Sequence, residues 1–319
     1  MTFMSRTTAA IMAALLLGAA GYAFYQWSRP QVVTITASGA FALYPLMVEW
    51  TEEYTGLHPE VKFEVSAGGA GKGMTDALNG LVDLGMVSRQ VYPEEAERGA
   101  FWVAVASDAV VVSVNSANPV LGELMASGLT AERLAAMYIH GNVTTWGQLV
   151  GDPGNTDPIR VYTRSDACGA AVTFAEYMGY AQEDLLGVGV YGDPGLAEAV
   201  RGDSLAIGYN NVNYAYDITS GQPVQGLAVV PLDVDGDGAI SNQEDYYGDR
   251  ASMVGAIADG LYPSPPSREL NLVTKDGFEG ATLEFVRWIL TEGQGMAEEA
   301  GFVPLSPERR HQELDKLGG

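Results

Sequence analysis

Three short loops of small residues could bind an anion, since each lies between an expected strand and an expected helix. They are Ser38-Gly39-Ala40-Phe41-Ala42, Gly68-Gly69-Ala70-Gly71 and Ala167-Cys168-Gly169-Ala170. Small side chains let a ligand approach the backbone, and the free N–H groups at a helix N-terminus favour negative charge. Ordinary turns of α/β proteins use the same residue types, so spacing alone leaves plain turn chemistry open.

Arg164 adds a cation to the third loop, two residues after Tyr162 in an expected strand. An arginine can grip a tetrahedral oxyanion with two parallel hydrogen bonds, and Asp166 could orient the guanidinium group. A surface arginine is the simpler alternative. Cys168 is the only cysteine, so no internal disulfide can form. We expect it to be a small buried residue whose thiol pKa is lowered by the helix N-terminus and Arg164. The three histidines lie far from it in sequence, so nucleophilic catalysis is not expected.

An acidic loop at residues 233–244 has the ligand spacing of an EF-hand calcium loop. Gly238 occupies the sixth position, where the sharp turn requires glycine. The expected ligands are side-chain oxygens and one backbone carbonyl, from Asp233, Asp235, Asp237, Ala239 (carbonyl), Ser241 and Glu244. A strand rather than a helix leads into the loop. We therefore predict a structural Ca²⁺ that clips an insertion, with an acidic surface turn as the alternative.

The overall charge restricts the possible partners. Asp and Glu number 40 against 17 Lys and Arg, which gives a net charge of -23. No basic face for nucleic acid is expected, and an anion site here must work through short-range donors. The acid excess also suits a salty environment, where screening reduces self-repulsion. Simple solubility explains it equally well.

The N-terminus indicates a location outside the cytoplasm. An uncharged run extends from Thr8 to Trp27, and Arg6 precedes it. Twenty helical residues span about 30 Å, the thickness of the hydrocarbon core. We predict an uncleaved membrane anchor in residues 1–30, with a cleaved signal peptide as the alternative. No cysteine follows the run, which excludes a lipoprotein.

The remaining chain alternates strands and helices as an α/β protein does. The helix after residue 192 should begin with Asp193 as its N-cap and Pro194 at the first helical position. The expected strands cover residues 32–37, 61–66, 83–87, 109–115, 159–163, 206–209 and 227–232.

Four motifs occur in an order that resembles a known family. S-G-A-F-A-L-Y-P, Y-I-H-G-N-V-T-T-W-G-Q-L, R-S-D-A-C-G-A-A-V-T-F and A-I-G-Y-N-N-V-N-Y-A are similar to the substrate-binding protein of the phosphate-specific (Pst) ABC transporter. The resemblance covers roughly residues 32–305. It implies a two-lobed α/β fold of the type II periplasmic-binding-protein class with two crossover strands, near residues 109–115 and 213–227. Residues 31–112 and 217–319 would form lobe 1, and residues 113–216 lobe 2.

The resemblance also implies which residues hold the anion. Arg164 matches the family arginine, and the other positions follow from the three loops. The implied set, with Asp166 as the arginine's partner, is Ser38, Ala40, Phe41, Gly69, Ala70, Ser88, Arg89, Cys168, Gly169 and Ala170. Alanine and cysteine replace several family hydroxyls. Arg89 stands where many members carry an acidic residue, and arginine cannot accept a hydrogen bond.

The resemblance finally implies a non-enzymatic receptor that delivers phosphate to an ABC importer. The permease and ATPase would be separate chains, and we expect the receptor to be a monomer. Another oxyanion, such as sulfate, molybdate or tungstate, is an alternative ligand. A hydrolase of phosphate esters and a calcium-dependent surface sensor or adhesion module are alternatives from other classes.

Overall fold

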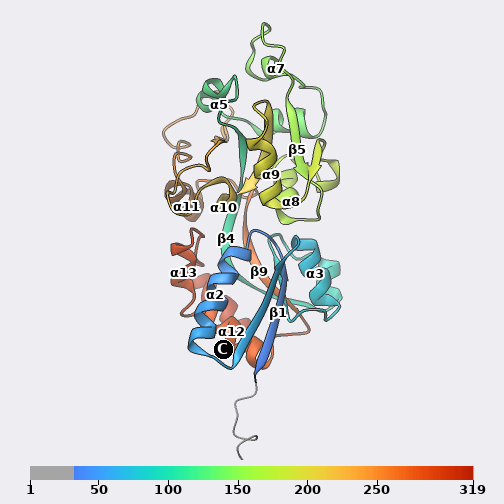
Figure 1. The fold of residues 1–319 in the computed structure, drawn as a ribbon, viewed down its shortest axis with the longest axis vertical. Helices are drawn as coiled ribbons and strands as arrows, with labels where there is room; N and C mark the ends of the chain where they lie inside the picture. The colour runs from blue at the N-terminus through green and yellow to red at the C-terminus, as the bar shows by residue number, and fades with distance from the viewer. Residues whose placement is uncertain (1–31, 319) are drawn as a thin grey trace, which may run out of the picture.

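The computed structural model describes residues 32–318, which form a mixed α/β protein with two lobes stacked along its long axis (Figure 1). A nine-stranded sheet runs through both lobes in the order β2-β1-β3-β9-β4-β7-β5-β6, and β8 pairs with β4. The strands are β1 (Val33–Gly39), β2 (Val61–Ala67), β3 (Leu84–Val87), β4 (Ala100–Asn115), β5 (Arg160–Arg164), β6 (Val188–Val190), β7 (Ala206–Asn211), β8 (Leu227–Val230) and β9 (Ser267–Lys275).

Helices follow most strands, as the alternating pattern predicts. They are α2 (Tyr44–Leu57), α3 (Ala70–Leu78), α4 (Pro93–Glu97), α5 (Leu121–Ser127), α6 (Ala131–Tyr138), α7 (Trp146–Val150), α8 (Gly169–Tyr177), α9 (Gly192–Arg201), α10 (Val212–Ala215), α11 (Arg250–Ala258), α12 (Gly280–Leu290), α13 (Gln294–Glu299) and α14 (Pro307–Lys316), with a short 3₁₀ turn at Gln182–Asp184. The β1–β2, β1–β3, β5–β6 and β5–β7 pairs are parallel. The carboxyl ends of β1, β2 and β5 therefore carry the loops that precede α2, α3 and α8, and the carboxyl end of β3 carries Ser88 and Arg89.

Two large apolar clusters define the lobes. Lobe 1 is built from residues 35–106 and 270–317, and lobe 2 from residues 109–262. Trp50 and Phe285 are buried in the first cluster, whereas Trp146, Tyr209 and Phe174 are buried in the second. Each lobe thus buries its own core.

The two crossing strands are β4 and β9, which pair antiparallel over residues 100–109 and 267–275. The first crossing lies in β4 between Ala106 and Ala109, at the edge of the expected residues 109–115, which themselves pack into the lobe 2 cluster. The second crossing lies at β9 rather than near residues 213–227, because residues 217–262 pack into the lobe 2 cluster. The expected lobe boundaries shift accordingly, and the acidic loop at residues 233–244 belongs to lobe 2.

The expected capping of α9 is also wrong. The N-cap is Tyr191, and Asp193 lies inside the first turn. Asp193 is completely buried, because its carboxylate pairs with a buried arginine described below.

The expected membrane anchor in residues 1–30 lies outside the described residues. Within residues 32–318, none of the helices combines the length and apolar character that crossing a bilayer requires.

Candidate functional site

The three small-residue loops meet at the junction of the two lobes. The N–H of Gly71 in lobe 1 donates to the carbonyl of Ala167 in lobe 2, at 3.0 Å. Gly69 has a φ of +92°, and a Cβ there would lie 2.9 Å from Asp166 Oδ2. A Cβ on Gly169 would lie 2.0 Å from the carbonyl oxygen of Ser88. Only glycine lets these backbones approach so closely.

Phe41 joins the first loop to the same junction. Its ring lies 5.4 Å from the Arg164 guanidinium carbon and packs edge-on against Tyr191 with centroids 5.8 Å apart. Its carbonyl accepts a hydrogen bond from the Tyr214 hydroxyl at 3.1 Å. Both Arg164 and Tyr214 belong to lobe 2, so Phe41 links lobe 1 to lobe 2 beside Arg164.

Arg164 is held on two sides by buried carboxylates. Its Nε and Nη2 donate to Asp166 at 2.8 and 2.6 Å, and its Nη1 donates to Asp193 at 2.5 Å. Burial lowers the pKa of Arg164, but Asp193 and Asp166 outweigh it, so the group stays charged. Three of the five guanidinium N–H groups are used by these bonds in the described chain. One N–H on each of Nη1 and Nη2 remains, which is the fork that grips an oxyanion.

The loops also carry backbone donors that the fold does not use. Within residues 32–318, no hydrogen bond is donated by the backbone N–H groups of Phe41, Ala42, Ala70, Gly169 and Ala170. The last three are at the starts of α3 and α8, where N–H groups have no partner inside the helix. Together with the Arg164 fork, these groups form a set of hydrogen-bond donors that the fold leaves unused. Such an arrangement suits a small oxyanion.

Ser38 has a different role from the expected one. Its buried hydroxyl donates to Asp76 Oδ2 at 2.6 Å, and Lys72 also pairs with that carboxylate. Burial raises the pKa of Asp76, but these two donors outweigh it, so the net pKa is lowered. Ser38 therefore fastens β1 to α3 and has no hydroxyl proton left for a ligand.

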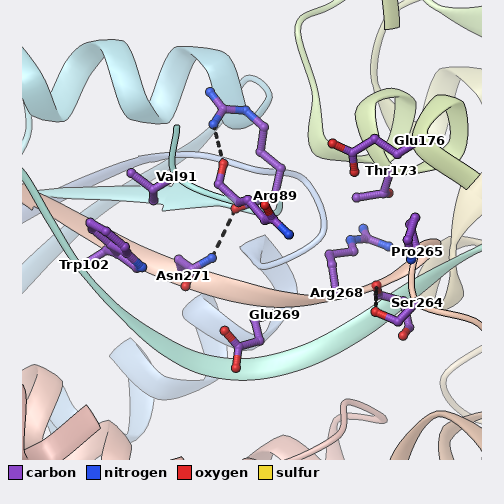
Figure 2. Close-up of a pocket in the computed structure, with 12 residues that line it drawn as sticks. Arg89, Val91, Trp102, Thr173, Glu176, Ser264, Pro265, Arg268, Glu269 and Asn271 are labelled. Atoms are coloured by element: carbon purple, nitrogen blue, oxygen red, sulfur yellow. Dashed lines mark hydrogen bonds between the residues drawn. The ribbon is translucent and has the colours of Figure 1, made fainter. Parts of the chain in front are cut away.

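Ser88 and Arg89 point in different directions. The Ser88 hydroxyl lies beside Gly169 at the start of α8, since a Cβ on Gly169 would be 2.3 Å from it. The Arg89 guanidinium turns away to Glu95, with two hydrogen bonds of 2.9 and 2.7 Å, and lies 4.2 Å above the Tyr92 ring. In Figure 2 it extends to the side opposite Thr173 and Arg268. Arg89 contributes no charge to the loop junction.

Cys168 is the N-cap of α8 and is buried, as expected. Its sulfur accepts a hydrogen bond from the Ala171 N–H at 3.4 Å. The expected lowering of its pKa is wrong. Burial raises the thiol pKa to about 12, although Arg164 acts in the opposite direction. A thiol with a raised pKa stays protonated at neutral pH and is a weak nucleophile, which argues against nucleophilic catalysis by Cys168.

A cavity of about 450 Å³ lies beside this junction, between the lobes and the crossing strands. Its lining includes Arg89, Trp102, Thr173, Arg268 and Asn271 (Figure 2). Thr173 is one helical turn beyond Gly169, and its hydroxyl donates to the Gly169 carbonyl at 2.9 Å. The cavity thus brings solvent close to the first turn of α8, next to the third loop.

The acidic loop at residues 233–244 folds around its own carboxylates. Asp233 accepts the N–H groups of Gly236 and Gly238 at 2.8 and 3.1 Å. Glu244 closes the loop by accepting Val234 N–H at 3.0 Å and the Ser241 hydroxyl at 2.8 Å. Oxygen atoms of three side chains lie within 4.8 Å of one another, those of Asp233, Asp235 and Asp237. This triad could hold a metal ion.

The acidic loop is fastened to lobe 2. Ile240 N–H donates to the Ala126 carbonyl at 2.9 Å, and Asp233 N–H donates to the Leu129 carbonyl at 3.2 Å. The loop, which follows β8, is therefore attached to the end of α5 and the residues just after it.

Sequence reasoning missed several residues around Arg164. Asp193 and Tyr214 contact the site from α9 and α10, and Lys72 with Asp76 braces it from α3. For Asp193 the signal was present but pointed to capping. The long-range partners could not be read from local spacing.

Residues 26–292 match the PBP superfamily domain. The phosphate-binding protein PstS of Xylella fastidiosa is 26% identical, covering 86% of this chain and 82% of that protein. PstS of Methanocaldococcus jannaschii is also 26% identical, covering 83% and 80%.

Two solved structures share the fold. A phosphate ABC transporter substrate-binding protein from Clostridium perfringens, solved with bound phosphate, has a TM-score of 0.68 at 23% identity and covers 86% of this chain and 100% of that one. An ABC-type phosphate transport receptor from Vibrio cholerae has a TM-score of 0.61 at 22% identity, covering 85% and 100%. With the family domain matched over most of its length, this chain belongs to the PBP superfamily.

Proposed function

We propose that this protein is a solute-binding protein that captures phosphate between its lobes and delivers it to an ABC importer. The observation that carries the proposal is the junction of three loops, which brings unused backbone N–H groups and Arg164 to the same region between the lobes. Relatives named PstS over most of the chain support phosphate as the ligand. The function is binding rather than catalysis.

The anion would be held mostly by backbone donors. Phe41 and Ala70 would bind it from lobe 1, and Gly169, Ala170 and the Arg164 fork from lobe 2. Because the donors come from both lobes, a bound anion would hold the lobes together. Ala40 and Gly69 would serve by their small size, and Ser88 by its hydroxyl.

Calorimetry on the full chain tests the ligand. Phosphate, sulfate, molybdate and tungstate are titrated separately, each with and without calcium. We expect phosphate to bind more tightly than sulfate. Binding of another oxyanion but not phosphate would support a receptor for that other oxyanion. This alternative is favoured by Arg89, which stands where many family members carry an acidic hydrogen-bond acceptor. A response to calcium alone would favour a surface sensor or adhesion module.

The acidic loop is proposed as a structural Ca²⁺ site. Asp233, Asp235, Asp237, Ser241 and Glu244 would supply side-chain oxygens, and Ala239 its carbonyl. The bonds from the loop to Ala126 and Leu129 mean that the ion would stiffen the edge of lobe 2. Limited proteolysis near Asp245 should accelerate when calcium is chelated.

The working location and partners follow from the proposed role. The receptor would act outside the cytoplasm as a monomer, with residues 1–30 anchoring it or being removed. Its partners would be permease and ATPase subunits on other chains. Fractionation of cells, followed by N-terminal sequencing of the mature protein, separates an anchored from a cleaved form.

A further inference from the structure

A row of buried charged and polar groups leads from Arg164 to the two crossing strands. Arg164 bonds to Asp193 Oδ2, and Asp193 Oδ1 accepts the N–H of Asn211 at 3.2 Å. The Asn211 side-chain oxygen accepts Nη2 of Arg268. Arg268 lies 3.7 Å from Asp108, its paired residue on the neighbouring strand. The row thus runs from β5 through α9 and the end of β7 to β9 and β4.

The inner end of this row is incompletely paired, unlike the outer end. Within residues 32–318, Asp108 Oδ2 and the Nε and Nη1 atoms of Arg268 have no hydrogen-bond partner. The Arg268 and Asp108 side chains are 5% and 2% exposed, and the 3.7 Å between them exceeds a hydrogen bond. Buried charges that lack partners are costly, so this pair does not serve stability alone.

The charges around Asp108 come from several elements. Arg268 faces it from β9, Asp193 acts on it from α9, and backbone N–H groups of Ala109 and Val212 bond to it. Tyr214 on α10 is also close enough to be influenced by it. Burial raises the pKa of Asp108 to about 6, although Arg268 opposes the rise. The pair therefore changes its net charge close to neutral pH.

We propose that Arg268 and Asp108 are positioning residues of the anion site, and that Asp108 takes up a proton when the anion binds. Arg268 holds Asn211 and, through it, the Asp193 carboxylate that fixes Arg164. The proton comes from solvent in the cavity that Arg268 lines (Figure 2). It bonds to Asp108 Oδ2. This inference rests on the proposed binding of phosphate.

Charge balance gives the reason for the proton uptake. With all groups ionised, the row contains Arg164 and Arg268 against Asp166, Asp193 and Asp108, a net charge of −1. An incoming anion adds a like charge and so raises the pKa of Asp108 further. By linkage, protonation of Asp108 favours anion binding by the same factor. Affinity should be highest with Asp108 protonated and fall as pH rises through about 6 and above.

The test is calorimetric titration of phosphate into the full chain between pH 5.5 and 8, in buffers of different ionisation enthalpy. The wild type should take up more protons near pH 6–7 than Asp108→Asn measured under the same conditions, since the ionisation of phosphate itself cancels in that difference. Asp108→Asn should bind with a flatter pH profile and more tightly than wild type at pH 8. Glu269→Gln, a neighbour of Arg268 on β9, is the control and should keep the wild-type profile.

Arg268 is tested in parallel. Arg268→Gln should weaken phosphate binding about tenfold or more, and Arg268→Lys should recover part of the loss because it restores the charge. Thermal melts identify variants that fail to fold. If the Arg268 variants do not fold, the comparison of Asp108→Asn with wild type decides the test. Equal proton uptake and equal pH profiles in wild type and Asp108→Asn overturn the inference while leaving phosphate binding intact. Absence of phosphate binding by the wild type at every pH overturns both this inference and the proposed function.

Discussion

The lobe junction and the acidic loop of lobe 2 use the same backbone groups in opposite ways. In the acidic loop, the N–H groups of Gly236, Gly238 and Ser241 are occupied by the loop's own carboxylates. At the junction, the N–H groups of Ala70, Gly169 and Ala170 have no such partner among the described residues. Both regions are rich in glycine. The difference lies in whether the segment supplies its own anions.

This difference determines the sign of the ion that each region can accept. Bound N–H groups gather the carboxylates of Asp233 and Glu244, whose remaining oxygens attract a cation. The free N–H groups at the junction, together with the Arg164 guanidinium, could attract an anion. The contrast also explains how a chain with a net charge of -23 can present an anion site, since the donors act only at short range.

Removal of the Arg164 guanidinium from the junction should have the largest effect on phosphate affinity. Arg164→Ala is expected to weaken phosphate binding by about 2–5 kcal/mol, because it leaves Asp166 and Asp193 as unpaired buried charges near the anion. Calorimetry measures the loss, and the calcium response should be unchanged. Arg160→Ala, on the same strand but exposed, is the control. Wild-type affinity in Arg164→Ala would remove this residue from the site.

Removal of the cation from the acidic loop should affect stability instead of phosphate affinity. Calcium at a hundredfold excess over its Kd would stabilise the protein by about 2.7 kcal/mol, visible as a rise in Tm. Asp233→Asn should abolish most of this rise, and Asp259→Asn, at an exposed helix end, should not. A Tm that ignores calcium and chelator would mean that the loop is an acidic turn.

A methyl group at the start of α8 should separate the two lobes. In Gly169→Ala the new Cβ would collide with the Ser88 carbonyl, so phosphate affinity should drop by about 1–3 kcal/mol, as overpacking costs suggest. Gly122→Ala adds the same methyl group in open space and should be neutral. Solution scattering should report a larger radius for Gly169→Ala in phosphate. Undiminished affinity would show that binding does not require the observed loop contact.

Replacement of the second arginine should have the smallest effect. Arg89→Gln breaks the pair with Glu95 but leaves the junction intact, so phosphate affinity should stay within about 0.5 kcal/mol of wild type. The same calorimetric titration measures it. A loss comparable to that of Arg164→Ala would mean that Arg89 swings into the site when the anion arrives.

Much of the fold could be predicted from local patterns. The β-branched runs and small-residue turns located β1, β2, β5 and β7 to within two residues. The return crossing at β9 was missed, because its sequence, S-R-E-L-N-L-V-T-K, mixes charged and apolar residues. Strand β9 lies between β3 and β4 in the sheet, and such a central position depends on partners distant in sequence.

The candidate site shows the same difference between features set by local sequence and features set by distant partners. The loops and Arg164 were predictable because backbone exposure at a helix N-terminus follows from local residue types. Three features could not be predicted from local residue types, because each depends on the position of one particular partner. They are the direction of Arg89, the hydrogen bond of the Ser38 hydroxyl and the burial of Asp193. The Cys168 pKa was misjudged for a related reason, since burial outweighed both the helix and Arg164.

The crossing of β9 between β3 and β4 also orders the assembly of the chain. Lobe 2 is continuous from residue 109 to residue 262 and can gather its core from one stretch. The lobe 1 sheet has a gap between β3 and β4 until residues 267–275 arrive, and its apolar cluster needs Phe285 and Ile289 as well. During synthesis, the N-terminal part of lobe 1 therefore cannot complete its core until the C-terminal residues have been made. Until then it is exposed to aggregation or proteolysis.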